Sequence, residues 1–220
     1  MKCAKWFITL GVLVVALAIP AKAETGDPMQ GYIAGGYSEV FGGASDALSG
    51  GWNISGGMIF HPNPARPFGL RVDLGFNDWN ASQSAINNIP GEGTGTAAID
   101  GGCATMWSLT TDALWQFGKP DHVGGYVGLG IGGYRRYAAL TNDVTTLGYI
   151  CDPYWGYCYY GTYYGSQVVG DDTLTKFGYN ASVGLTFPVG NGEMYLEARY
   201  HYIVSTQLDE YMPIVLGYRF

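Results

Sequence analysis

The chain is poor in charge, and above all in positive charge. Charged residues make up 13% of its 220 residues, and Lys and Arg together number 11. Three of these, Lys2, Lys5 and Lys22, lie in the first 23 residues, and the remainder of the chain contains no basic run. Nucleic acids and anionic membrane surfaces attract proteins through patches of Lys and Arg. The composition therefore argues against both as partners.

Long hydrophobic runs are also missing after residue 23, so no helix is expected to span a bilayer there, which takes roughly 20 apolar residues. The single apolar run, Phe7–Ile19, follows two lysines and precedes Ala21-Lys22-Ala23. This order is typical of a cleaved secretory signal peptide. We expect residues 1–23 to be removed, which leaves residues 24–220 with 8 basic and 18 acidic residues and a formal charge of −10.

Cysteine is scarce, with four in the chain, one of which (Cys3) precedes the apolar run of the signal. Cys151 and Cys158 bracket the sequence CDPYWGYC. An exported protein folds in an oxidising compartment, so we predict a disulfide between these two residues. Cys103 is left over, either free or competing for one of the pair. Two thiols without a neighbouring His or third thiolate do not indicate zinc, and we expect neither a metal nor a cofactor.

Glycine and tyrosine are abundant, at 35 and 18 residues, and they accompany segments of alternating polarity. Apolar residues recur at a spacing of two from Phe68 to Phe76, which predicts a β-strand and not a helix. Similar segments of about ten residues, the length that crosses a bilayer when tilted, follow along the chain. We place these further strands at about 32–40, 51–60, 106–117, 123–137, 176–187, 193–202 and 211–220.

The connections between these segments alternate in length. They are short after the second, fourth and sixth strands and longer after the first, third and fifth, with long loops expected near residues 79–102 and 140–172; the seventh is short as well. Short turns at one end and long loops at the other are typical of an outer-membrane barrel. We therefore predict an all-β fold, an eight-stranded antiparallel up-and-down transmembrane β-barrel.

The two faces of the strands distinguish a membrane barrel from a soluble sandwich. The apolar face carries aromatic residues near both strand ends, such as Trp52 with Phe60, and Trp107 with Phe117, where interfacial girdles lie. The other face has few and balanced charges, and a narrow barrel fills its interior with such side chains. Because an unpaired buried charge is costly, we predict an internal ion-pair network. Its expected members are Arg71, Asp73, Asp112, Lys176, Glu193, Glu197, Arg199 and Arg219.

With the signal segment, the alternating strands, LEARYHY at 196–202 and the terminal YMPIVLGYRF, the chain resembles the small eight-stranded bacterial outer-membrane barrels of the OmpA, OmpX and opacity-protein kind. The resemblance implies an integral protein of a Gram-negative outer membrane, in contact with lipid and lipopolysaccharide, and we expect a monomer. It also implies that the barrel-assembly machinery reads the alternate residues of the last strand. These are Ile214, Leu216, Tyr218 and Phe220.

The segment from 140 to 172 concentrates aromatic residues, which offer rigid, amphipathic contact area. We predict a structural or surface-interaction protein whose loop is exposed outside the cell and is a candidate surface for adhesion to a host or cell-surface ligand. The alternative is a loop that packs on itself and on lipopolysaccharide sugars. The candidate contact residues are Tyr154, Trp155, Tyr157, Tyr159, Tyr160, Tyr163 and Tyr164.

Two other functions compete with surface contact: a narrow porin-like pore for small solutes, and a lipid-modifying enzyme. The lipid A deacylases of this architecture have a His and a Ser separated by one residue on the lipid-facing side. Here His201 is expected on the inward face and Ser205 lies four residues on, while His61 and His122 lie in turns. Acyl transfer needs a nucleophile, an oriented base and an oxyanion site together, so we expect no catalytic residue and no enzyme.

Overall fold

The computed structural model of the protein describes residues 28–63, 67–82, 101–118, 122–151, 158–204 and 209–220. For 142–151, 158–167, Val169 and Asp209, it describes the backbone alone. The expected signal peptide lies outside the described residues.

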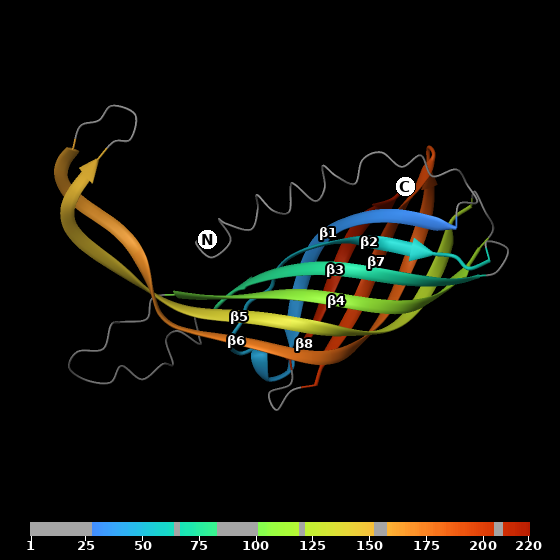
Figure 1. The fold of residues 1–220 in the computed structure, drawn as a ribbon, viewed down its shortest axis with the longest axis horizontal. Helices are drawn as coiled ribbons and strands as arrows, with labels where there is room; N and C mark the ends of the chain where they lie inside the picture. The colour runs from blue at the N-terminus through green and yellow to red at the C-terminus, as the bar shows by residue number, and fades with distance from the viewer. Residues whose placement is uncertain (1–27, 64–66, 83–100, 119–121, 152–157, 205–208) are drawn as a thin grey trace.

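Eight antiparallel strands form a closed barrel in chain order (Figure 1), because β1 pairs with β8 as well as with β2. This confirms the predicted fold class. A 3₁₀ turn, η1 (Gly42–Ala44), follows the first strand. No helix among the described residues is long and apolar enough to cross a membrane. The strands are β1 (Met29–Phe41), β2 (Gly51–Phe60), β3 (Phe68–Asn80), β4 (Gly101–Phe117), β5 (Gly124–Cys151), β6 (Cys158–Val189), β7 (Gly192–Ile203) and β8 (Asp209–Arg219).

Two strands are far longer than expected. We expected an irregular loop near residues 140–172, but β5 and β6 continue through it as paired strands up to Cys151 and Cys158. We call residues 141–151 and 158–168 the arm. Figure 1 shows the arm leaving the barrel wall and curving away from it. The arm is rich in Tyr and Thr, which favour strands. Of the other expected loop, near 79–102, residues 83–100 lie outside the described residues.

A β-bulge marks the base of the arm. Leu140 is the Cα partner of Gly170, whereas Thr141 is the partner of Val168, so Val169 has no counterpart on β5. A bulge bends its strand and increases the local twist. Figure 1 shows β5 and β6 bending where the arm leaves the barrel.

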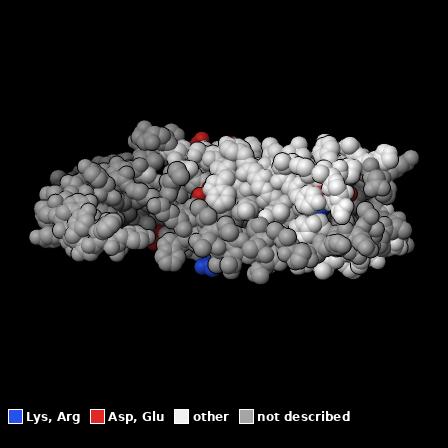
Figure 2. All heavy atoms as spheres, turned by 90° about the horizontal axis from the view of Figure 1, so that it is seen from above, with Lys and Arg blue, Asp and Glu red and all other residues white. Residues whose placement is uncertain are grey.

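The outward face of the barrel is apolar. On β8, Ile214 and Leu216 are 46% and 54% exposed, whereas Tyr211 and Val215, at alternating positions, are buried. Figure 2 shows few charged atoms on the described part of the wall facing the viewer. Toward the arm, the ring of Phe76 lies 5.3 Å from that of Trp52 and 4.9 Å from that of Trp107. Exposed aromatic residues also lie near the opposite end, namely Phe60, Phe68, Trp115, Phe117, Phe187 and Tyr218. The outward face therefore has the aromatic bands of a membrane barrel.

Candidate functional site

Two arginines and three carboxylates meet inside the barrel. Glu197 on β7 bridges both arginines, with Oε2 at 2.5 Å from Arg71 Nη1 and Oε1 at 2.6 Å from Arg199 Nη2. Arg71 Nε also lies 2.7 Å from Asp112 Oδ2, and Arg199 Nη1 lies 2.9 Å from Asp73 Oδ1. All five side chains are buried. Strand alternation on β3, β4 and β7 brings these charges to the inward face, and pairing offsets part of their cost of burial.

Tyrosine hydroxyls complete this network. Tyr126 on β5 donates a hydrogen bond to Glu197 Oε2 at 2.7 Å, and Tyr32 on β1 donates one to Asp73. Hydrogen bonds to a charged group are stronger than those between neutral groups. Neither tyrosine was among the residues that we predicted for the network, because we expected the inward face to consist of small residues and charges.

Inward glycines on neighbouring strands make room for the tyrosine rings. Tyr126 is the Cα partner of Gly184, and Tyr195 is the partner of Gly217. A Cβ atom on either glycine would overlap the partner's ring. The guanidinium of Arg219 lies over both rings, 4.5 Å from the centroid of Tyr126 and 4.9 Å from that of Tyr195. The tyrosine rings therefore fill the space above the glycines. At the end of the barrel where β8 ends, they also form a cation–π interaction with Arg219.

The other predicted network members lie apart from the centre. Arg219 Nη1 is 3.5 Å from Glu193 Oε2, and the Glu193 side chain is 42% exposed. We expected Arg219 among Glu193 and Glu197, and it forms an ion pair with the first of them. Lys176 is half-buried and forms no ion pair with any residue whose side chain is described. The eight residues therefore divide into a central group of five, a rim pair and Lys176.

His201 lies on the inward face, within an aromatic cluster toward the arm. Its ring stacks on Tyr211 with centroids 4.3 Å apart, and its Nδ1 shares a 2.9 Å hydrogen bond with the Tyr134 hydroxyl. Trp79 packs edge-on against Tyr211 at 5.4 Å. These contacts join β3, β5, β7 and β8 across the interior, so the cluster supports the barrel wall.

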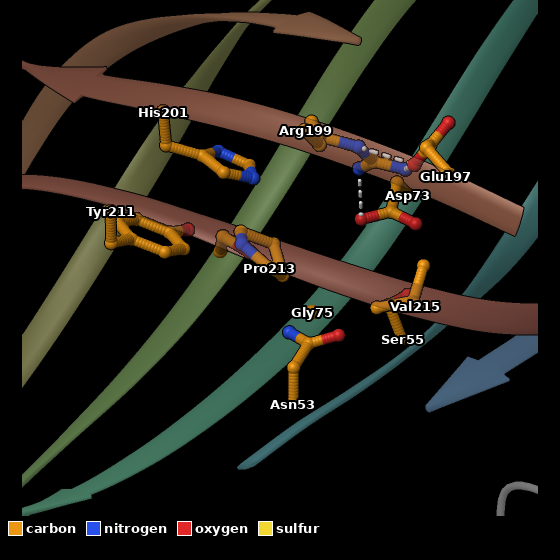
Figure 3. A pocket seen from close by; sticks show the side chains of 11 residues that line it. Asn53, Ser55, Asp73, Gly75, Glu197, Arg199, His201, Tyr211, Pro213 and Val215 are labelled. Atoms are coloured by element: carbon orange, nitrogen blue, oxygen red, sulfur yellow. Dashed lines mark hydrogen bonds and ion pairs between the residues drawn. The ribbon is translucent and has the colours of Figure 1, made fainter. Parts of the chain in front are cut away.

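A small cavity remains between the charge network and this cluster. Figure 3 shows Arg199 turned toward Asp73 and Glu197, with His201 and Asn53 farther along the lining. The volume of about 10 Å³ is close to the room that one water molecule needs. In the described part of the chain, this cavity included, no group of three His, Cys, Asp or Glu side chains is placed to hold a metal ion. The lumen is thus filled by side chains, as expected for eight strands.

A comparison with known protein families matches this closed barrel to one of them. Residues 9–220 match the model of the outer membrane protein beta-barrel domain. The chain belongs to this family. It is an integral protein of the bacterial outer membrane, and its outward face meets the lipid and lipopolysaccharide of that membrane. No curated protein sequence matches it significantly.

Solved structures of outer-membrane barrels are similar to it in fold. Neisserial surface protein A shares 12% identity at a TM-score of 0.54, over 88% of this chain and 96% of that one. A major outer membrane protein of Thermus thermophilus shares 12% identity at a TM-score of 0.48, over 88% and 100%. OprG of Pseudomonas aeruginosa shares 9% identity at a TM-score of 0.46, over 90% and 99%. At such identities, the first of these supports the fold alone.

The terminal residues of this outer membrane barrel lie at its closing seam. Ile214, Leu216 and Tyr218 are exposed on the outward face. Phe220 exchanges two backbone hydrogen bonds with Gly31 on β1, at 3.1 and 2.9 Å. The residues that resemble an assembly signal therefore form the outer face of the strand that closes the barrel, and their recognition by assembly machinery stays a prediction.

The cysteines occupy two separate places. Cys151 and Cys158 are Cα partners at the last described rung of the arm. Cys103, at the start of β4, is disulfide-bonded, and its partner is not among the described side chains. It is therefore not the free thiol that was one of our two expectations.

Of the predicted contact residues, Tyr159, Tyr160, Tyr163 and Tyr164 lie on β6 in the arm. The others, Tyr154, Trp155 and Tyr157, lie outside the described residues.

Replacing Tyr126 with phenylalanine should lower the free energy of unfolding by about 1.5–3 kcal/mol, because Glu197 loses a buried donor to a charged group. Reversible urea unfolding in phospholipid vesicles measures this. Tyr37→Phe is the matched control, since the Tyr37 hydroxyl donates to Glu39 at the same 2.7 Å on the exposed surface. It should leave the unfolding midpoint unchanged, and equal shifts in both variants would contradict the importance of the buried bond.

Proposed function

We propose that this outer membrane barrel is a surface-contact protein and that the arm is its contact element. The observation that carries the proposal is the continuation of β5 and β6 beyond the barrel, with paired residues from Thr141 and Val168 to Cys151 and Cys158. The arm springs from the end opposite the start of β1 and the end of β8, where an outer-membrane barrel has its extracellular loops. A paired ribbon holds its residues in fixed positions relative to one another, which a freely moving loop does not.

The composition of the arm suits contact with another molecule. Between residues 141 and 168 the chain has no Lys, Arg or His, and it has its densest group of tyrosines. Tyrosine provides large, rigid, amphipathic contact area at low entropic cost, and binding surfaces are enriched in it. The facing positions of Cys151 and Cys158 also support the proposed disulfide, which would close the end of the ribbon.

The packed lumen argues against the alternative function as a pore. Arg71, Glu197 and Arg199 join strands across the interior, and the cavity beside them has room for about one water molecule. A solute would have to displace paired, buried charges in order to pass. Surface contact is therefore favoured over conduction.

Deletion of the arm tests this proposal. Replacing residues 141–169 with Asn-Gly joins Leu140 to its partner Gly170 through a two-residue hairpin turn. We expect the barrel to keep its heat-modifiable gel mobility, while attachment of bacteria expressing it to cultured epithelial cells falls to the level of bacteria without it. A second variant keeps the arm but changes its tyrosines to threonine, which separates the length of the arm from its chemistry. Undiminished attachment after deletion would contradict the proposal.

A further inference from the structure

The small cavity between the charge network and the aromatic cluster has a polar lining. Of the eleven residues around it, all but Gly75, Pro213 and Val215 have polar side chains. An apolar cavity inside a protein stays dry, whereas a polar one takes up water when it offers the water two to four hydrogen-bond partners. The polar atoms of the lining, and the partners that they already have, therefore decide what this cavity holds.

Two polar atoms of the lining form no hydrogen bond with any described residue. One is Oδ1 of Asn53, although Nδ2 of the same side chain donates to Asn77 Oδ1 at 2.9 Å. The other is the hydroxyl oxygen of Tyr211. Asn53 is 6% exposed and Tyr211 is 2% exposed. A buried polar atom without a partner destabilises the folded state, so both atoms favour a bound molecule that can serve as their partner.

A water molecule provides what the two atoms need. It can donate a hydrogen bond to Asn53 Oδ1 and accept one from the Tyr211 hydroxyl. The same lining offers it further partners. Asp73 Oδ1 accepts from Arg199 Nη1 at 2.9 Å, and a carboxylate oxygen can accept a second hydrogen bond. His201 uses Nδ1 for its hydrogen bond within the aromatic cluster, and Figure 3 shows the far end of its ring directed into the lining.

Gly75 on β3 keeps room for this molecule. A Cβ atom on Gly75 would lie 2.6 Å from Ser108 Oγ and 3.6 Å from Asp73 Oδ1, and both of these residues also line the cavity. A side chain of a single carbon at position 75 would therefore occupy part of the space that a water molecule needs. Alanine at this position is the smallest change that fills the cavity.

We propose that this cavity binds one ordered water molecule, which bridges the charge network and the aromatic cluster. Hydrogen bonds then run from Asp73 on β3 through the water to Tyr211 on β8. The volume of about 10 Å³ suits one water molecule and no larger ligand. The guanidinium of Arg199 in the lining disfavours a bound cation, as does the lack, among the described residues, of three His, Cys, Asp or Glu side chains placed around a metal ion.

A high-resolution crystal structure of the full barrel tests the site directly. It should show one peak of electron density at hydrogen-bond distance from Asn53 Oδ1 and from the Tyr211 hydroxyl. The same peak should be missing from the structure of Gly75→Ala. A natural protein without the peak would overturn the inference, and so would a peak that persists in the folded Gly75→Ala variant.

Two tyrosine variants test whether the water stabilises the barrel. Tyr211→Phe and Tyr195→Phe each remove a buried hydroxyl that has no partner among the described residues, but only Tyr211 lines the cavity. Tyr211→Phe should raise the equilibrium constant of unfolding about fivefold, the size of one hydrogen bond, whereas Tyr195→Phe should leave it unchanged or lower it. When it is combined with Gly75→Ala, Tyr211→Phe should have little further effect. Reversible urea unfolding in phospholipid vesicles measures all four proteins.

Three results of these unfolding experiments would overturn the inference. They are equal shifts in the two phenylalanine variants, an undiminished effect of Tyr211→Phe beside Gly75→Ala, and an unfolding midpoint that changes when tetramethylammonium replaces sodium, which would identify a small cation in place of water. Heat-modifiable mobility shows whether each variant has folded. If Gly75→Ala does not fold, the crystal structure of the natural protein and the phenylalanine pair still decide the question.

Discussion

Replacing Glu197 with alanine should lower the free energy of unfolding of the barrel by about 3–5 kcal/mol. Glu197 accepts from Arg71 at 2.5 Å and from Arg199 at 2.6 Å, and it is 1% exposed. Its removal leaves Asp112 and Asp73 as the ion-pair partners of these arginines and takes away the carboxylate that joins them. Two buried guanidinium groups would then repel each other without the carboxylate that joins them.

Glu193→Ala is the matched control for this experiment. Glu193 also pairs with an arginine, Arg219, but at 3.5 Å and with a side chain that is 42% exposed. Exposed ion pairs contribute little, so its loss should cost less than about 1 kcal/mol. Reversible urea unfolding of both variants in phospholipid vesicles gives the comparison. Equal destabilisation would show that the central network has no special weight in the stability of the barrel.

Replacing Gly36 with alanine should prevent normal closure of the barrel. Gly36 lies on β1 at the seam with β8, and a Cβ atom there would overlap the backbone carbonyl of Ile214. A backbone atom in a strand ladder cannot move aside without loss of hydrogen bonds. We therefore expect destabilisation of at least about 3 kcal/mol, at or beyond the upper end of the usual overpacking range.

Gly35→Ala provides the control, since the two glycines are neighbours on one strand. A Cβ atom on Gly35 would lie 3.6 Å from the Asn53 carbonyl oxygen, which is an ordinary contact. Heat-modifiable mobility and the yield of protease-resistant barrel after refolding into vesicles measure both variants. Gly36→Ala should yield little folded barrel, and Gly35→Ala should resemble the natural protein. Normal closure of Gly36→Ala would show that the seam is looser than its register indicates.

The barrel and the direction of its faces were predictable from the sequence because they depend on local alternation. Phe68 to Phe76 and the terminal decapeptide show a period of two, and both became strands at the expected places. The paired charges at Arg71 and Glu197 were also expected on the inward face. Each of these inferences needed only the rule that neighbouring residues on a strand face opposite ways.

The remaining features depend on register, which the sequence does not show. That Tyr126 lies over Gly184, and that Lys176 lies beside Tyr134, follow from which residues of β5 and β6 are partners. The arm was expected to be a loop because its glycines and its polar residues interrupt the hydrophobic pattern. Pairing along its whole length compensates for that weak pattern, since each strand supplies the other's hydrogen bonds.

The unbroken passage of β5 and β6 from the barrel into the arm has a mechanical consequence. A pull on the far end of the arm acts along both strands, so the load passes into β4 and β7 as shear. The hydrogen bonds between β4 and β5 run from Gly101 to Phe117, and those between β6 and β7 from Gly178 to Val189. In shear these bonds resist together instead of opening one at a time. An attachment made by the arm would therefore be anchored by the wall of the barrel itself, and the bulge at Val169 would be the point at which the arm yields first.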